Sequence, residues 1–292
     1  MRQATDLYLD SRRARNCRPA TIDSYGSALR EFARLIGSDT PLRRVTPQDV
    51  EHYVSRRLAT TSPATAKLQS GIVTTFLQWA SARGLASAHP WADVGHVHVD
   101  SPSPRWLCGE ECERLIEAAE TARTKSIIAA LREPAIVRLM IDTGMRAGEV
   151  LRLRLSELDL ESRTAHISAE SKGRRARLVF FTQRTSAALR AYLRVRNSRK
   201  RTTDRVFISE RSSALSRTRL HGLVADAAQR AGLSDVSPHT LRHSCATMLL
   251  DRGLGLHEVQ RLLGHASIAT TSMYLHADAA RLKMAYDKAT AA

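Results

Sequence analysis

The residues that begin helices are the feature of this chain that most restricts its fold. Proline suits the first position of a helix, and a Ser or Thr before it can cap the free N–H groups there. Such starts lie at Pro19, Thr46-Pro47 and Ser62-Pro63, and apolar residues follow each one at helical spacing. With a further helix near residues 5–15, they predict a bundle of four helices within residues 1–88.

A stretch rich in proline separates this bundle from the rest of the chain. Residues 89–105 hold Pro90, Pro102 and Pro104 without any helical period, so we interpret them as a linker. Residues 106–292 predict a second, mostly helical domain, with a hairpin of two short strands at 164–168 and 175–181. Its expected helices are 110–120, 134–142, 183–196, 217–231, 238–251, 256–263 and 278–288. The predicted fold class is mainly α with a small β-hairpin or sheet.

The charge of the chain indicates a polyanionic partner. Its 292 residues carry 45 Lys and Arg against 29 Asp and Glu, a formal charge of +16, of which +12 falls after residue 100. A folded chain with such a charge most often binds nucleic acid. Arginine outnumbers lysine by 39 to 6. This bias fits a GC-rich genome, and it also fits phosphate contacts, because the guanidinium fork matches phosphate oxygens.

Composition also excludes several classes of protein. No apolar run approaches the ~20 residues that cross a membrane, and the N-terminus lacks the apolar core of a signal peptide. The 4 cysteines are too few for a disulfide scaffold, so we expect a reduced, cytoplasmic protein. A zinc site built from His96, His98, Cys108 and Cys112 is disfavoured by the histidine spacing, and the two cysteines also fit one face of a helix.

Two helix starts in the second domain hold side chains that could bind a phosphate. The segment that begins at Pro238 places His239 and Arg242 in the first turn of a helix, where backbone N–H groups already favour an anion. Arg146 also stands at a helix start, and Glu149 one turn later could hold its guanidinium. Each pattern alone also fits a solvated surface, the first as a basic helix start and the second as a surface ion pair.

Three sequence motifs follow one another in the second domain, and together they resemble those of a known family. The segments are TGMRAGEVLRL at 143–153, HTLRHSCATMLL at 239–250 and LLGHASIATTSMYLH at 262–276. Together they resemble the tyrosine recombinase, or phage integrase, family, and most of all its short Xer-type members. The motifs cover about 130 residues of the second domain, and the N-terminal bundle adds a weaker match.

The resemblance implies which residues act on DNA. The side chains that would surround the scissile phosphate are Arg146, His239, Arg242 and His265, with Glu149 in support. Tyr274 would attack that phosphate and form a covalent 3′-phosphotyrosyl bond, which the 5′-hydroxyl of a partner strand reseals. Two such exchanges through a four-way junction would complete integration, excision or resolution. The chemistry implied needs no ATP, no metal ion and no other cofactor.

One lysine stands out in this arginine-rich chain. The family uses a lysine in a β-hairpin turn, and Lys172 lies in the predicted turn as the only lysine between residues 126 and 199. Arginine stays charged near neutral pH, whereas the pKa of a lysine shifts readily. Lys172 would therefore be the proton donor to the departing 5′-oxygen.

The resemblance also implies domains and an assembly. Residues 1–88 would form a helical core-binding (SAM-like) domain and residues 106–292 a mixed α+β catalytic domain. The partner would be double-stranded DNA, with a tetramer of this chain, or of this chain and a related recombinase, on two recombination sites. A tail helix at 278–292 would dock on a neighbouring protomer or fold on its own domain. The side chains expected to grip DNA are Arg174, Arg175, Arg177, Arg217 and Arg219.

Three other functions fit part of the pattern. A type IB topoisomerase-like enzyme would share the chemistry but relax DNA alone, and the separate N-terminal bundle disfavours it. A non-catalytic DNA-binding regulator would not need all six catalytic positions filled. A metal nuclease would need a cluster of ligands that the sequence does not show.

Overall fold

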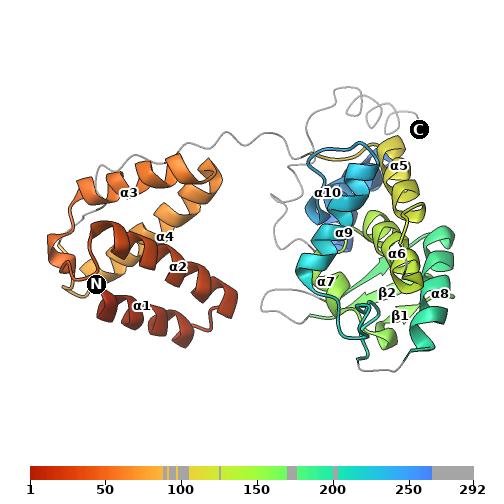
Figure 1. The fold of residues 1–292 in the computed structure, drawn as a ribbon, viewed down its shortest axis with the longest axis horizontal. Coiled ribbons are helices and arrows are strands. Elements are labelled where there is room, and N and C mark those ends of the chain that lie inside the picture. Colours follow the sequence, from red (N-terminus) through yellow and green to blue (C-terminus); the bar gives the residue numbers. More distant parts are fainter. Residues whose placement is uncertain are drawn as a thin grey trace, which may run out of the picture. The chain divides into compact units, whose positions relative to one another are not determined.

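The computed structural model describes residues 1–87, 91, 97, 105–124, 126–169, 176–199 and 203–264. The chain divides into two compact units, Met1–Pro102 and Ser103–Ala292 (Figure 1). The predicted hairpin turn at 170–174 and the predicted tail helix at 278–292 lie outside the described residues.

The first unit is a bundle of helices. These are α1 (Arg2–Ala14), α2 (Pro19–Ile36), α3 (Pro47–Thr60) and α4 (Pro63–Ser81), with a short 3₁₀ helix at Leu42–Arg44. The side-chain oxygens of Thr46 and Ser62 accept the N–H groups of the first turns of α3 and α4, as predicted from the sequence. The core of the bundle is mostly aliphatic and also contains the aromatic residues Tyr8, Phe32, Tyr53 and Phe76.

The second unit is built around one buried helix. Its helices are α5 (Gly109–Glu120), α6 (Ile127–Thr143), α7 (Ala147–Arg152), α8 (Gln183–Asn197), α9 (Arg217–Arg230), α10 (Pro238–Asp251) and α11 (Leu256–Leu263), with a 3₁₀ helix at Leu155–Glu157. Helix α6 packs against α5, α8 and α10 (Figure 1). The predicted mainly α fold is confirmed.

A small antiparallel sheet completes the second unit. Its strands are β1 (Leu158–Asp159), β2 (Thr164–Ile167) and β3 (Arg177–Phe180), in the order β1-β2-β3. Strands β2 and β3 form the predicted hairpin, in which Thr164 pairs with Phe180 and Ile167 with Arg177. Strand β1, only two residues long, carries too little periodicity to be predicted from the sequence.

The largest difference from prediction concerns α6. The sequence places its start at Pro134, whereas the helix begins at Ile127 and runs through the proline. A proline inside a helix costs about 3 kcal/mol because it removes one hydrogen bond and clashes with the preceding turn. Twelve of the 17 residues of α6 are buried, so the packing of this central helix outweighs that cost.

Candidate active site

The last turn of α11 is the meeting point of three arginines. The helix ends at Leu263, and Gly264 follows in the left-handed conformation with φ +66°. The last carbonyl groups of a helix lack partners within it. Three of them, at residues 262–264, accept hydrogen bonds from the side chains of Arg146, Arg177 and Arg242.

Arg146 and Arg242 converge on one oxygen atom. The Leu263 carbonyl accepts from Nη2 of Arg242 at 2.8 Å and from Nη1 of Arg146 at 3.5 Å. Arg146 also donates to the Gly264 carbonyl at 3.2 Å, and Arg242 to the Gly144 carbonyl at 2.7 Å. Two of the predicted catalytic side chains, nearly 100 residues apart in sequence, are thus brought together at the end of α11.

Gly144 allows this close approach. It ends α6 in the left-handed conformation, with φ +59°. A Cβ atom at this position would overlap Leu263 Cδ2 and would lie 3.2 Å from the Sγ atom of Cys245. A side chain here would therefore strain the left-handed turn and force the side chain of Leu263 to shift, at the place where Arg242 binds the carbonyl groups of Gly144 and Leu263.

Glu149 connects two of the arginines. Its carboxylate accepts the Arg146 backbone N–H at 2.9 Å and Nη1 of the same residue at 3.1 Å. It also accepts both Nη groups of Arg177, at 3.1 and 2.7 Å. Burial acts to raise the pKa of Glu149, but the hydrogen bonds and positive charges of Arg177 and Arg146 outweigh it and hold the pKa at about 2. The supporting carboxylate is therefore ionised at neutral pH.

His239 lies in a strongly positive environment. It follows Pro238 in the first turn of α10, where Ser237 caps the helix. Desolvation lowers the pKa of His239, and the charges of Arg242, His221, Arg217 and Arg146 lower it further. A lowered pKa favours the neutral imidazole, which is the form that can accept a proton.

The predicted DNA-binding arginines fall into different surroundings. Arg217 is exposed at the first position of α9. Arg219 donates from Nη2 to Oε1 of Glu133 at 2.8 Å. The side chain of Arg177 is only 8% exposed, and it donates hydrogen bonds to Glu149 and to the Leu262 carbonyl. The predicted site residues outside the described part of the chain are Lys172, Arg174, Arg175, His265 and Tyr274.

The disfavoured zinc site gains no support from the described residues. The cysteines are free thiols; Cys108 is exposed at the start of α5, whereas Cys112 is buried. No group of three or more His, Cys, Asp or Glu side chains that could hold a metal ion occurs among the described residues. His96 and His98 lie outside them. In the same part of the chain, no helix is long and apolar enough to cross a membrane.

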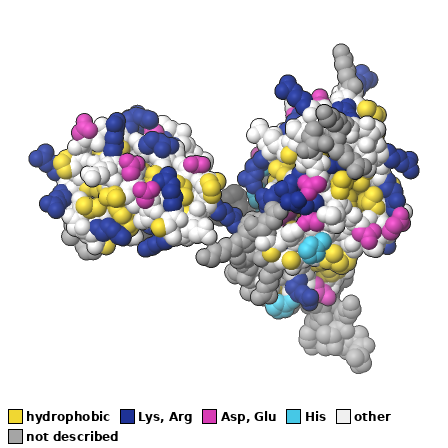
Figure 2. Space-filling model, turned by 90° about the horizontal axis from the view of Figure 1, so that it is seen from below, with side chains coloured by type: hydrophobic (Ala, Val, Ile, Leu, Met, Phe, Trp, Pro, Cys, Tyr) yellow, Lys and Arg dark blue, Asp and Glu magenta, His cyan; other side chains and the backbone are white. Residues whose placement is uncertain are grey.

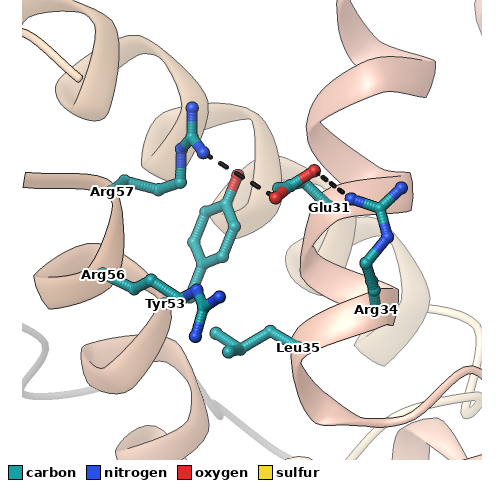
Figure 3. Close-up of a pocket in the computed structure, with 6 residues that line it drawn as sticks. All are labelled: Glu31, Arg34, Leu35, Tyr53, Arg56 and Arg57. Atoms are coloured by element: carbon teal, nitrogen blue, oxygen red, sulfur yellow. Dashed lines mark hydrogen bonds and ion pairs between the residues drawn. The ribbon is translucent and has the colours of Figure 1, made fainter. Parts of the chain in front are cut away.

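The first unit holds a second basic feature, a hollow of about 200 Å³ between α2 and α3 (Figure 3). Glu31 lies in it between two arginines, 2.7 Å from Arg34 and 3.8 Å from Arg57. Arg56 and Tyr53 complete its lining with Leu35. Lys and Arg side chains also lie at many places on the visible face of both units (Figure 2). Charge suited to a nucleic acid is therefore not restricted to the candidate active site.

Sequence reasoning missed two parts of the site. His221 lies on α9 one turn after Arg217, and only this i to i+4 spacing could have linked the two. The carbonyl groups at the end of α11 had no sequence signal as ligands of arginine, because every residue has a carbonyl. Gly264, which marks the end of the helix, was the nearest indication.

Comparisons with known proteins agree with this geometry. The sequence model of the phage integrase family matches residues 105–281, and that of the phage integrase N-terminal SAM-like domain matches residues 6–84. The tyrosine recombinase XerD of Ralstonia nicotianae is 33% identical over 282 residues, which cover 95% of this chain and 89% of the relative. A tyrosine recombinase XerC of Mycobacterium sp. (strain JLS) is 31% identical over 297 residues, covering 98% and 97%.

Solved structures give the same result. The post-cleavage complex of the XerH site-specific recombinase, bound to its palindromic difH substrate, has a TM-score of 0.76 and 25% identity, covering 94% of this chain and 81% of that one. The XerA recombinase has a TM-score of 0.57 and 27% identity, covering 99% and 98%.

The helical fold, the converging arginines and these matches define one class of protein. The chain belongs to the phage integrase family. It is a tyrosine site-specific recombinase, similar to the Xer enzymes over most of its length. The regulator and topoisomerase alternatives are not favoured by these relatives.

Proposed function

We propose that this recombinase cuts one DNA strand by attack of Tyr274 on a phosphate held by Arg146 and Arg242, and then joins the cut end to a partner strand. The supporting observation is that both guanidiniums donate to a single oxygen, that of Leu263. Phosphate oxygens accept from guanidinium groups in the same way. Each guanidinium has five N–H donors, so Arg146 retains capacity beyond its present contacts. The two cations stabilise the charge that grows on the phosphorane.

Three further residues complete the proposed chemistry. His239 accepts the proton of the Tyr274 hydroxyl, and its lowered pKa supports this role because it favours the neutral imidazole. Lys172 protonates the departing 5′-oxygen, and His265, next to Gly264 in sequence, donates a hydrogen bond to the phosphate. The product is a 3′-phosphotyrosyl bond that conserves the energy for rejoining, so the step uses no cofactor.

The proposal extends to domains and assembly. Residues 1–88 hold DNA as a core-binding domain, residues 89–105 link it to the catalytic domain at 106–292, and the tail at 278–292 docks on a neighbouring protomer. Arg217 grips a phosphate, as do Arg174 and Arg175. Four protomers join two sites through a four-way junction, on bacterial DNA in the cytoplasm, for a mobile element or for chromosome resolution. The proposed DNA partner is supported by the similar XerH recombinase, whose structure was solved bound to its difH substrate.

A comparison of the wild type with Tyr274→Phe tests the proposed nucleophile. Duplexes that become covalently attached to the wild-type protein are selected from a random pool. The wild type should retain DNA through denaturing gel electrophoresis, whereas Tyr274→Phe should bind the selected duplex with equal affinity and retain none. Covalent retention by Tyr274→Phe, or none by the wild type, would refute the proposal. Relaxation of supercoiled DNA that lacks the selected site would instead favour a topoisomerase.

A further inference from the structure

Arg177 occupies a junction of three parts of the candidate site. It is the first residue of β3 and pairs with Ile167 of β2, at the end of the hairpin nearest the turn. Lys172 lies five residues earlier in sequence. The side chain of Arg177 reaches the end of α11 and the carboxylate of Glu149.

The contacts of Arg177 use both edges of its guanidinium. Nε donates to the Leu262 carbonyl at 2.7 Å. Nη1 and Nη2 donate to the two carboxylate oxygens of Glu149 at 3.1 and 2.7 Å, a bidentate pair. The two side chains are 8% and 4% exposed, so water competes little with these bonds.

Gly264 shows how closely the two segments fit. A Cβ atom at this position would lie 3.1 Å from both Cδ and Nη1 of Arg177 and 3.2 Å from its Nε. The side chain of Arg177 therefore lies directly against the backbone of the turn that follows α11. His265 is the next residue in sequence, so a shift of Arg177 would be passed to the segment that carries this predicted catalytic residue.

We propose that Arg177 is a positioning residue, which fixes the base of the Lys172 hairpin, the Glu149 carboxylate that holds Arg146, and the end of α11 as one rigid unit. This inference rests on the proposed function, since it concerns the same chemistry. It replaces the phosphate contact that the sequence predicted for Arg177. A lysine cannot take over the role, because one ammonium group cannot form the bidentate pair and reach Leu262 in the same planar arrangement.

The test compares variants with the wild type on the selected duplex. Arg177→Lys keeps the charge but loses the fork, Arg217→Gln removes a proposed phosphate contact, and Arg190→Gln removes an exposed cation that pairs with Glu161 at 2.7 Å. The measurements are the rate of covalent attachment at saturating DNA, the dissociation constant and its dependence on salt. A DNA-free measurement follows amide hydrogen exchange in β3 and α11.

Arg177→Lys should lower the rate of attachment by roughly 10- to 100-fold, as displaced catalytic groups do, with a dissociation constant within about threefold of the wild type. Amide exchange should become faster in both β3 and α11 and stay unchanged in α8. Arg190→Gln should match the wild type in every measurement.

Two results would overturn the inference. In one, Arg177→Lys attaches at the wild-type rate or leaves amide exchange in β3 and α11 unchanged. In the other, Arg177→Gln, which lacks the cation, binds DNA more weakly and reduces the slope of log affinity against log salt by about 1, as loss of a phosphate contact does. If the wild type forms no adduct, the proposed function fails, while hydrogen exchange still decides whether Arg177 joins these segments.

Discussion

Replacing Glu149 by glutamine removes the one carboxylate that the described residues place between Arg146 and Arg177. The structure holds the pKa of this carboxyl at about 2 instead of 4.5. That difference corresponds to about 3 kcal/mol of stability at neutral pH, at about 1.4 kcal/mol for each tenfold change in acidity. A neutral glutamine cannot supply this stability, and the buried Arg177 loses its counter-ion as well. Glu149→Gln should therefore destabilise the second unit by about 3 kcal/mol.

Calorimetry of the full chain can follow this loss, because two units can give separate transitions. A loss of about 3 kcal/mol should lower the melting temperature of a unit of this size by roughly 6–12 °C. Glu161→Gln is the matched control, since Glu161 also lies 2.7 Å from an arginine but its side chain is 85% exposed. Its effect should stay below about 0.5 kcal/mol.

The pH dependence gives a second check on the same reasoning. The pKa of Glu149 is lower in the folded than in the unfolded chain, so its contribution is complete above pH 4.5 and is lost as the pH falls towards 2. The difference in the free energy of unfolding between wild type and Glu149→Gln should be largest at pH 7 and smaller by roughly 1 kcal/mol at pH 3.5. A gap below about 1 kcal/mol at pH 7, or one that does not narrow in acid, would refute the reasoning.

Three further outcomes are expected. Lys172→Ala should become attached to ordinary DNA slowly. On a duplex with sulfur at the 5′-bridging position its rate should be nearly that of the wild type, because a thiolate leaves without a proton. An equal defect on both duplexes would exclude Lys172 as the acid. Gly144→Ala should lower stability by roughly 2–4 kcal/mol in urea unfolding, since it strains the left-handed turn and overlaps Leu263, and an unchanged midpoint would contradict this. Arg217→Gln should reduce the slope of log affinity against log salt by about 1, whereas a parallel line would show that Arg217 touches no phosphate.

The sequence was most informative where local chemistry decides structure. Helices α10 and α11 begin and end at the predicted residues, because Pro238 and Gly264 mark their boundaries in a way that tertiary packing does not change. The pairing of Arg146 with Glu149 was also predictable, since both belong to the first turn of one short helix. Helix α6 shows the opposite case, in which burial on most sides overrode the usual meaning of a proline.

Long-range contacts were beyond such reasoning. The prediction placed Arg177 at the DNA because a basic hairpin looks solvated from sequence alone. Its partners, Glu149 on α7 and the Leu262 carbonyl on α11, lie 28 and 85 residues away, and only tertiary packing brings them together. Arg219 likewise donates a hydrogen bond to Glu133, which lies 86 residues away in sequence.

The acceptors at the end of α11 have a consequence for how this protein can vary. Because backbone atoms orient Arg146, Arg177 and Arg242, substitutions at the half-buried Leu262 leave the acceptors themselves in place, whereas Leu263 is also fixed by its buried packing beside Gly144. Insertion of one residue into α11 would be different, since each residue turns a helix by about 100°. The site therefore tolerates a change in the identity of Leu262 far better than a change in the number of residues, and the length of α11 should be held fixed wherever this arrangement of arginines is kept.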